Sequence, residues 1–317
     1  LLPNEMIRSW LASQASGYDV ALIPVGILCA SILSIFLHWQ IRIKGFATIA
    51  KATLAQSVLA ASSQGLASAI PFVHSGLVFG YVIGLVVGAA YMGKRLLWKN
   101  LTMIATSPWR KLWETARTYR SYPAYSTWEA VANAAAIHLP VLMIAMSLDP
   151  AEAGYLAIAM YVMQAPMALF GGAVGQAYLA NAVGEYRSAR LFAFTKGVVK
   201  HLFMIGIFPI VLIGALSPYL FPLIFGEAWL RAGWLVTWMT PWFMAQFLAS
   251  PVSMALHVVG AQITAMNLQI GNLTLRVGAT GIAIALFPSH ALEIYALSGG
   301  AVYVIYLWVV FYKIRCK

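Results

Sequence analysis

Long, unbroken apolar runs are the feature that most constrains this chain. A helix that crosses a bilayer needs roughly 20 consecutive, mostly apolar residues. Of the 317 residues, 62% are hydrophobic and 9% are charged, whereas a soluble domain carries about 25% charged residues. So few charges cannot cover a water-soluble globule, and we therefore predict an all-α, polytopic membrane protein.

The apolar runs divide the chain into nine predicted spanning helices. Helices are favoured over a β-barrel because the runs are continuous, whereas barrel strands are segments of about ten residues with alternating polarity. The predicted helices cover residues 18–37, 46–70, 73–93, 124–147, 153–182, 193–216, 232–257, 264–287 and 291–312.

Basic residues gather in alternate connections between these helices and in the tail. Because cytoplasmic loops of membrane proteins collect Lys and Arg, the net charge of +11 is explained without a nucleic-acid partner. The basic side, with the C-terminus, is predicted to be cytoplasmic, and the opposite connections hold Asp149, Glu152, Glu227, Arg231 and Glu293. The basic residues are Arg42, Lys44, Lys94, Arg95, Lys99, Arg110, Lys111, Arg117, Arg120, Arg187, Arg190, Lys313, Arg315 and Lys317.

Parity then places the start of the chain, residues 1–19, on the outer side. Such a start is unusual without an earlier helix to deliver it, so we expect that an odd number of upstream helices is missing.

The longest connection, residues 94–122, separates three predicted helices from six. Within it, Ile104 to Tyr119 carries Trp109, Leu112 and Trp113 among basic residues. This pattern fits either an amphipathic helix on the inner headgroups or an ordinary solvated basic loop.

Polar side chains inside the runs are costly in lipid and therefore informative. They indicate either a water-filled cavity or hydrogen bonds between helices. For Arg276 and Glu129 we favour the cavity, because Arg276 lies near the middle of its run and cannot easily reach the headgroups. The candidate residues are Lys51, Gln56, Glu129, Asn133, Gln269, Asn272 and Arg276.

Spacing adds detail to this set. Glu129 with Asn133, and Asn272 with Arg276, are four residues apart and share a helix face. His138 and His257 are expected to be packed and hydrogen-bonded, not metal ligands.

Proline and glycine give further local expectations. Gly80, Gly84 and Gly88 form a small-residue stripe that predicts a close contact between helices. Bent helices are expected where proline interrupts the runs, at Pro140, Pro166, Pro209, Pro241 and Pro251.

No catalytic motif is present in the sequence. There is no nucleotide-binding glycine loop, no zinc-binding histidine pair and no nucleophile elbow. The two cysteines, Cys29 and Cys316, form no disulfide framework. We therefore expect no enzymatic activity, no cofactor and no metal.

Four degenerate motifs follow one another along the chain, and their order and spacing are informative. They resemble the Wzx-type polysaccharide flippases of the multidrug/oligosaccharidyl-lipid/polysaccharide exporter superfamily. The motifs are Gln40–Phe46 with Ile49 and Ala50; Tyr119–Ser126 with Asn133, Leu139 and Pro140; Ala153–Ala157 with Gln164–Pro166 and Gly171–Gln176; and Phe225–Trp229 with Ala232 and Gly233.

The resemblance implies a MATE-like bundle of two six-helix lobes. Residues 1–93 would be the C-terminal part of the first lobe, 94–122 a basic cytoplasmic inter-lobe loop and 123–317 the second lobe. Only three helices precede the loop, so the resemblance implies that about three N-terminal helices are missing.

The resemblance also implies a function in surface polysaccharide (O-antigen, lipopolysaccharide) biosynthesis. The chain would flip a polyprenyl-diphosphate-linked oligosaccharide across the bacterial inner membrane, beside a polysaccharide polymerase and chain-length proteins. Arg276 and then Lys51 would contact the diphosphate, and Glu129 would couple a proton or cation, or neutralise Arg276. Amides would line the path: Asn272, Gln269, Asn133 and Gln56.

Other functions stay open. A multidrug exporter of the same superfamily would use buried acids, and this chain has one convincing intramembrane acid against two basic residues. A lipid II flippase, or a non-transporting subunit of a glycan assembly complex, is a further alternative. A membrane-bound enzyme fits least, because no acid–base constellation is present.

Overall fold

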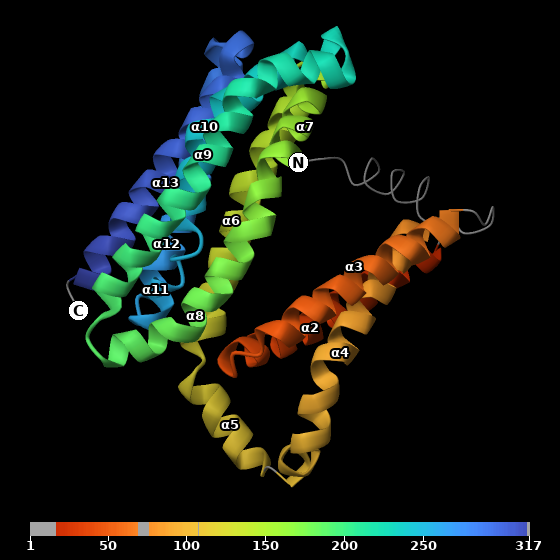
Figure 1. Cartoon of the computed structure of the whole chain (residues 1–317), viewed down its shortest axis with the longest axis vertical. Helices are drawn as coiled ribbons and strands as arrows, with labels where there is room; N and C mark the ends of the chain where they lie inside the picture. Colours follow the sequence, from red (N-terminus) through yellow and green to blue (C-terminus); the bar gives the residue numbers. More distant parts are fainter. Residues whose placement is uncertain (1–16, 69–75, 107, 316–317) are drawn as a thin grey trace. The chain divides into compact units, whose positions relative to one another are not determined.

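The computed structural model describes residues 17–68, 76–106 and 108–315, and all regular elements in these ranges are helical (Figure 1). The predicted all-α fold is thereby confirmed. The predictions for residues 1–16, 69–75 and 316–317 lie outside the described residues. The helices are α2 (Gly17–Arg42), α3 (Phe46–Ser68), α4 (Gly76–Thr106), α5 (Trp109–Thr118), α6 (Ser121–Ser147), α7 (Pro150–Pro166), α8 (Gly172–Arg187), α9 (Leu191–Phe225), α10 (Leu230–Ala249), α11 (Ala255–Val258), α12 (Gln262–Leu286) and α13 (Ala291–Arg315), with the short turns η1 (Met167–Gly171), η2 (Glu227–Trp229) and η3 (Pro288–His290).

Four helical stretches in the described part of the chain are both long enough and apolar enough to cross a membrane. They are Leu22–Arg42, Ser121–Ser147, Leu191–Phe225 and Pro288–Arg315. A fifth apolar stretch, Val78–Lys94, is shorter. The chain is therefore a membrane protein that spans the bilayer several times. The remaining predicted spans are helices with more polar residues, and their crossing of the membrane stays a prediction.

The chain folds as two compact units, Leu1–Leu112 and Trp113–Lys317. In the first unit α3 and α4 pack closely along the glycine stripe of α4. A Cβ added at Gly84 would lie 2.8 Å from the Cβ of Ala60, and one at Gly80 would lie 2.7 Å from the backbone nitrogen of Gln64. Real Cβ atoms do not approach so closely, so the glycines are needed for this contact, as the sequence predicts.

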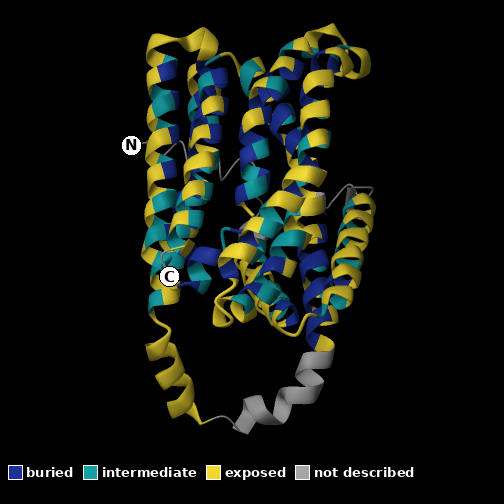
Figure 2. Ribbon diagram, turned by 60° about the vertical axis from the view of Figure 1, so that its left-hand side comes forward, coloured by how far each residue is buried: buried dark blue, intermediate teal, exposed yellow. Residues whose placement is uncertain are grey.

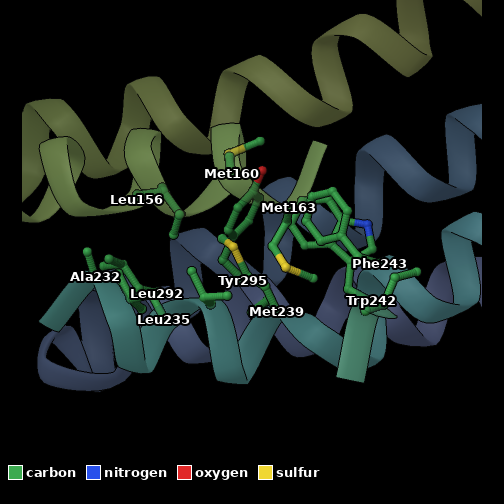
Figure 3. Close-up of a cluster of buried hydrophobic side chains, with 14 of the residues drawn as sticks. Leu156, Met160, Met163, Ala232, Leu235, Met239, Trp242, Phe243, Leu292 and Tyr295 are labelled. Atoms are coloured by element: carbon green, nitrogen blue, oxygen red, sulfur yellow. The ribbon is translucent and has the colours of Figure 1, made fainter. Parts of the chain in front are cut away.

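The second unit is built around two clusters of buried apolar side chains. The larger cluster joins α7, α10 and α13, and Figure 3 shows its centre, with Met160 and Met163 of α7 facing Met239 of α10 and Tyr295 of α13. The smaller cluster joins α8, α11 and the last turns of α13, and includes Tyr178, Leu256 and Val310. In this unit the long helices keep exposed residues on their outward sides (Figure 2), as expected where lipid is the solvent.

The basic connection 94–122 is mostly helical. Helix α4 continues to Thr106, and α5 forms a separate amphipathic helix whose residues are all exposed (Figure 2). Trp109, Leu112 and Trp113 share one face of α5 at helical spacing. A helix therefore forms within the segment for which helix and loop were the alternatives, and its contact with headgroups stays a prediction.

Proline ends or changes a helix at only some of the five positions, and bending at the others stays a prediction. Helices α6, α9 and α10 continue through Pro140, Pro209 and Pro241. Only two of the five sites show a change. The π-turn η1 follows Pro166, and the predicted helix 232–257 breaks into α10 and α11 around Pro251. In membrane helices neighbouring groups and local π adjustments satisfy the carbonyls that proline frees, so a single proline need not end a helix.

Candidate functional site

Helix α12 carries a stripe of polar residues through the interior of the second unit. Asn272, Arg276 and Thr280 are four residues apart and therefore share one face of the helix. Their exposed fractions are 3%, 0% and 0%. This face is turned inward, because α12 packs against α6 and α13.

Arg276 packs against two aromatic rings. Its guanidinium carbon is 4.0 Å from the ring centroid of Trp242 in α10 and 4.4 Å from that of Tyr295 in α13. The two rings meet edge to face, with centroids 5.4 Å apart, and Figure 3 shows both of them in the core of this unit. The Tyr295 hydroxyl donates to the carbonyl of Ile137 in α6, at 3.3 Å. Four helices thus fix the position of this cation.

The guanidinium has no hydrogen-bond partner among the residues that the structure describes, at Nε or at either terminal nitrogen. The same holds for Asn272 Oδ1 and Thr280 Oγ1 on α12, and for Trp242 Nε1 and Gln246 Oε1 on α10. Buried polar atoms without partners are rare in folded proteins, because each costs about 1–3 kcal/mol. Trp242 and Gln246 are one turn apart on α10, and the α12 residues share one face, so unused hydrogen-bonding capacity gathers around the contact of Arg276 with Trp242.

Arg276 touches no water-sized space in this conformation, because it is fully buried. The water-filled cavity that the sequence predicts around Arg276 is therefore not open here. The physical reason is that the rings of Trp242 and Tyr295 pack directly against its guanidinium group. An anion can reach Arg276 only if these helices separate.

The two neighbouring amides of the candidate set meet on α12. Asn272 Nδ2 donates to Gln269 Oε1 at 3.1 Å. Asn272 is buried and Gln269 is half-buried. These two side chains and Arg276 form one continuous polar group on a single helix.

Glu129 has a different partner from the one that the counter-ion hypothesis requires. Its carboxylate lies 3.2 Å from Nε2 of His257 in α11, and both side chains are largely buried. This contact joins α6 to α11 and confirms that His257 is packed and hydrogen-bonded. Glu129 does not neutralise Arg276 in this structure.

The remaining candidates are dispersed. Asn133 follows Glu129 by one turn on α6 and is half-buried. Lys51 and Gln56 belong to α3 in the first unit. Lys51 is exposed, whereas Gln56 packs against Gly88 of α4, with its Oε1 2.9 Å from the position that a Cβ would take.

A cluster of charged residues that was not predicted from the sequence lies where α7, α10 and α13 begin. Arg231 at the start of α10 donates to Glu293 Oε1 at 2.6 Å and lies 3.3 Å from Glu152 Oε2. Glu152 and Glu293 lie in the first turns of α7 and α13, where the helix dipole favours acids. The cluster ties three helix N-termini together. One indication of this cluster was present in the sequence, because all three residues were assigned to the same side of the membrane.

Trp242, Tyr295 and Thr280 were also missed by sequence reasoning. Aromatic and threonine residues are too common in apolar helices to stand out singly. The four-residue spacing of Thr280 from Arg276 was the only signal in the sequence.

Residues 3–233, well over half of the chain, match the model of a family described as polysaccharide biosynthesis protein. No curated protein and no solved structure matches the chain at a significant level. The family match covers all of the described first unit and continues in the second through α9 and the first turn of α10. It agrees with the resemblance of the sequence motifs. The chain belongs to the polysaccharide biosynthesis protein family, and its role lies in polysaccharide biosynthesis.

Proposed function

We propose that this chain moves a polyprenyl-diphosphate-linked oligosaccharide across the bacterial inner membrane, and that it is not an enzyme. The observation that carries the proposal is the fully buried Arg276, whose hydrogen-bond donors are unused, in a membrane protein of a polysaccharide biosynthesis family. The C-terminus is on the cytoplasmic side in this proposal.

The chemistry of the cargo supports this assignment. A diphosphate with attached sugars cannot cross hydrocarbon unaided, because burying charges and hydroxyls without partners is too costly. A guanidinium presents a planar fork of donors that matches phosphate oxygens. The amides of Gln269 and Asn272 beside Arg276 can bind sugar hydroxyls.

The described conformation is closed at Arg276. In the proposal, movement of α10 and α13 relative to α12 takes the rings of Trp242 and Tyr295 away from Arg276 and admits the headgroup. The lipid tail stays in the bilayer. This is alternating access at a site between helices.

The other candidates have subsidiary roles in the proposal. Lys51 is a second cationic contact, since it is exposed on α3. Gln56 and Asn133 line the path. Glu129 and His257 form an acid–imidazole pair that can pass a proton and so couple transport to an ion gradient. A polysaccharide polymerase and chain-length proteins are the proposed partners.

The test is complementation of a flippase-deficient strain with the complete gene. Surface polysaccharide should return with the unaltered gene and stay absent with Arg276→Met, which keeps side-chain length and removes the charge. Arg276→Lys keeps the charge but loses the fork and should restore the polysaccharide only weakly.

Lys200→Met serves as the matched control, because Lys200 is exposed on α9 and should leave rescue intact. All variants are compared at equal membrane levels. Full restoration of surface polysaccharide by Arg276→Met would show that Arg276 is not part of the binding site. Drug resistance without polysaccharide would instead favour the multidrug exporter.

A further inference from the structure

A groove lies between the first turns of α9 and the last turns of α13. It has a volume of about 350 Å³ and is lined by Phe192, Lys196, Trp308, Phe311, Tyr312 and Arg315. Trp308 follows Tyr295 by 13 positions along α13, or about 20 Å, so the groove is separate from Arg276. Nothing in the proposed transport step uses it.

Aromatic rings form the walls of the groove. Trp308 and Tyr312 are stacked with centroids 5.7 Å apart, and Phe192 meets Phe311 edge to face at 5.9 Å. Trp308 and Tyr312 nevertheless remain 66% and 54% exposed. Trp and Tyr with exposed, amphipathic rings are typical of the headgroup level of a membrane.

Each helix contributes one cation to the groove. Lys196 of α9 and Arg315 of α13 are both exposed, and neither has an ion-pair partner in the part of the chain that the structure describes. Two cations beside aromatic walls select a ligand with a negative charge at one end and an apolar body.

The apolar surface continues from the groove toward the middle of both helices. On α9, Phe192, Lys196 and Phe203 share a face at helical spacing, and Phe203 is 55% exposed. On α13, Ile305 lies one turn before Trp308 on the groove side and is 48% exposed. A ligand whose charged group lies at Lys196 and Arg315 could therefore pack its apolar chains against these exposed side chains.

We propose that this groove binds an anionic phospholipid of the cytoplasmic leaflet. The phosphate lies between Lys196 and Arg315, the glycerol region against Trp308, and the acyl chains along Phe203 and Ile305. The volume of the groove is at the lower end of the about 300–1,000 Å³ of small-molecule sites, which suits a lipid headgroup. The choice of leaflet rests on the proposed cytoplasmic C-terminus.

The experiment uses the full chain in nanodiscs with brominated phosphatidylglycerol or brominated phosphatidylcholine. The difference in fluorescence between the unaltered chain and Trp308→Phe isolates the signal of Trp308 from the other tryptophans. Each basic side chain near an anionic surface favours binding by about fivefold, so two give a preference of about 30-fold for phosphatidylglycerol.

Lys196→Gln with Arg315→Gln should abolish the preference. Arg187→Gln with Lys313→Gln removes the same charge from the same end without touching the groove, and should keep it. Equal quenching by the two lipids, or a preference that survives in Lys196→Gln/Arg315→Gln, would overturn the proposal.

Two competitors distinguish the source of the phosphate. Inorganic phosphate at constant ionic strength should leave the lipid bound, and displacement would show a small-anion site instead. Polyprenyl diphosphate should also fail to displace phosphatidylglycerol. Displacement by that carrier would assign the groove to the cargo and refute the phospholipid site. The readout is lipid binding, so it does not depend on transport.

Discussion

Arg276 is the residue whose energetics most need a functional explanation. A cation over an aromatic ring gains about 2 kcal/mol when desolvated, so its two ring contacts supply roughly 4 kcal/mol. Removing a charge from water costs several kcal/mol per ion even after relaxation, and its donors are unpaired. The contacts in this conformation therefore at most offset the cost of burial, which fits a residue kept for binding.

Arg276→Met should accordingly leave the fold as stable as before or stabilise it by about 1–3 kcal/mol, because a buried unpaired charge is replaced by an apolar side chain of similar length. Thermal unfolding of the purified protein in detergent measures this. A large loss of stability would mean that the cation holds the core together, and would weaken its assignment to the cargo.

Arg231 should behave in the opposite way. Arg231→Gln leaves the carboxylate of Glu293, which is only 7% exposed, without its cation, and should lower stability by about 1–2 kcal/mol. Arg190 offers a matched comparison, since its pair with Glu185 is at the surface and its side chain is 69% exposed. Arg190→Gln should change stability by less than about 1 kcal/mol. Equal melting temperatures for both variants would contradict this.

For single residues, burial is easier to predict from the sequence than the side chains that each residue contacts. The burial of Arg276 and Asn272 follows from their position within one apolar run. The contacts of Arg276 with Trp242 and Tyr295, and of Glu129 with His257, join helices that are distant in sequence. Their register depends on packing that no local pattern encodes.

The helices are the scale at which prediction succeeds best. Each predicted run corresponds to a helix or helix pair in the described residues, usually within a few positions. The main errors are helices longer than predicted: α4 continues past residue 93 through basic turns, and α9 continues past residue 216 through the mostly apolar Ser217–Phe225. The break at Pro251 and the π-turn after Pro166 were predicted as proline effects, but not distinguished from the tolerated prolines.

Close helix contacts give a prediction at this scale. A Cβ at Gly233 of α10 would lie 2.6 Å from the carbonyl oxygen of Ser217 and 2.9 Å from Cα of Pro218. Backbone atoms cannot yield easily, so Gly233→Ala should destabilise by about 1–3 kcal/mol. Gly278→Ala is the control, because nothing lies within 4 Å of its Cβ position and alanine favours a helix by up to about 1 kcal/mol. Thermal unfolding that ranks the two variants in the reverse order would refute the packing argument.

Helix α5 should lie on the membrane surface with Trp109, Leu112 and Trp113 toward the acyl chains. Spin labels at Leu112→Cys and Glu114→Cys, in a background without native cysteines, test this in liposomes. The label at position 112 should be accessible to oxygen, and that at position 114 to a water-soluble nickel reagent. Equal accessibility to water at both positions would show that α5 is solvated on all sides.

For the whole molecule, the amino-acid composition is what predicts a membrane protein. The all-α membrane fold and the family follow from apolar runs, their order and their short motifs. The asymmetry of charge predicts an orientation in the membrane. The contacts of Trp242 and Tyr295 with Arg276 could not be predicted, because they depend on the packing of helices that are distant in sequence.

The orientation predicts the outcome of reporter fusions. Green fluorescent protein should fluoresce when fused after Tyr119, Ser188 or Arg315, at the basic ends. Alkaline phosphatase should be active after Asp149, Glu227 or Pro288. Phosphatase activity after Arg315 would reverse the orientation and move the phospholipid groove to the other leaflet.

The charge cluster at Arg231 has a mechanical consequence. It holds the N-terminal ends of α7, α10 and α13 together by ion pairs, whereas the last turns of α13 are held by apolar packing in the smaller cluster, which can slide more easily. A helix of 25 residues is about 37 Å long, and a tilt of about 10° about its N-terminal end displaces its C-terminal end by about 6 Å. Lys196 and Arg315 border the C-terminal end of α13, which has the longest lever arm, so such a rotation of α13 against α9 changes the distance between these two cations most.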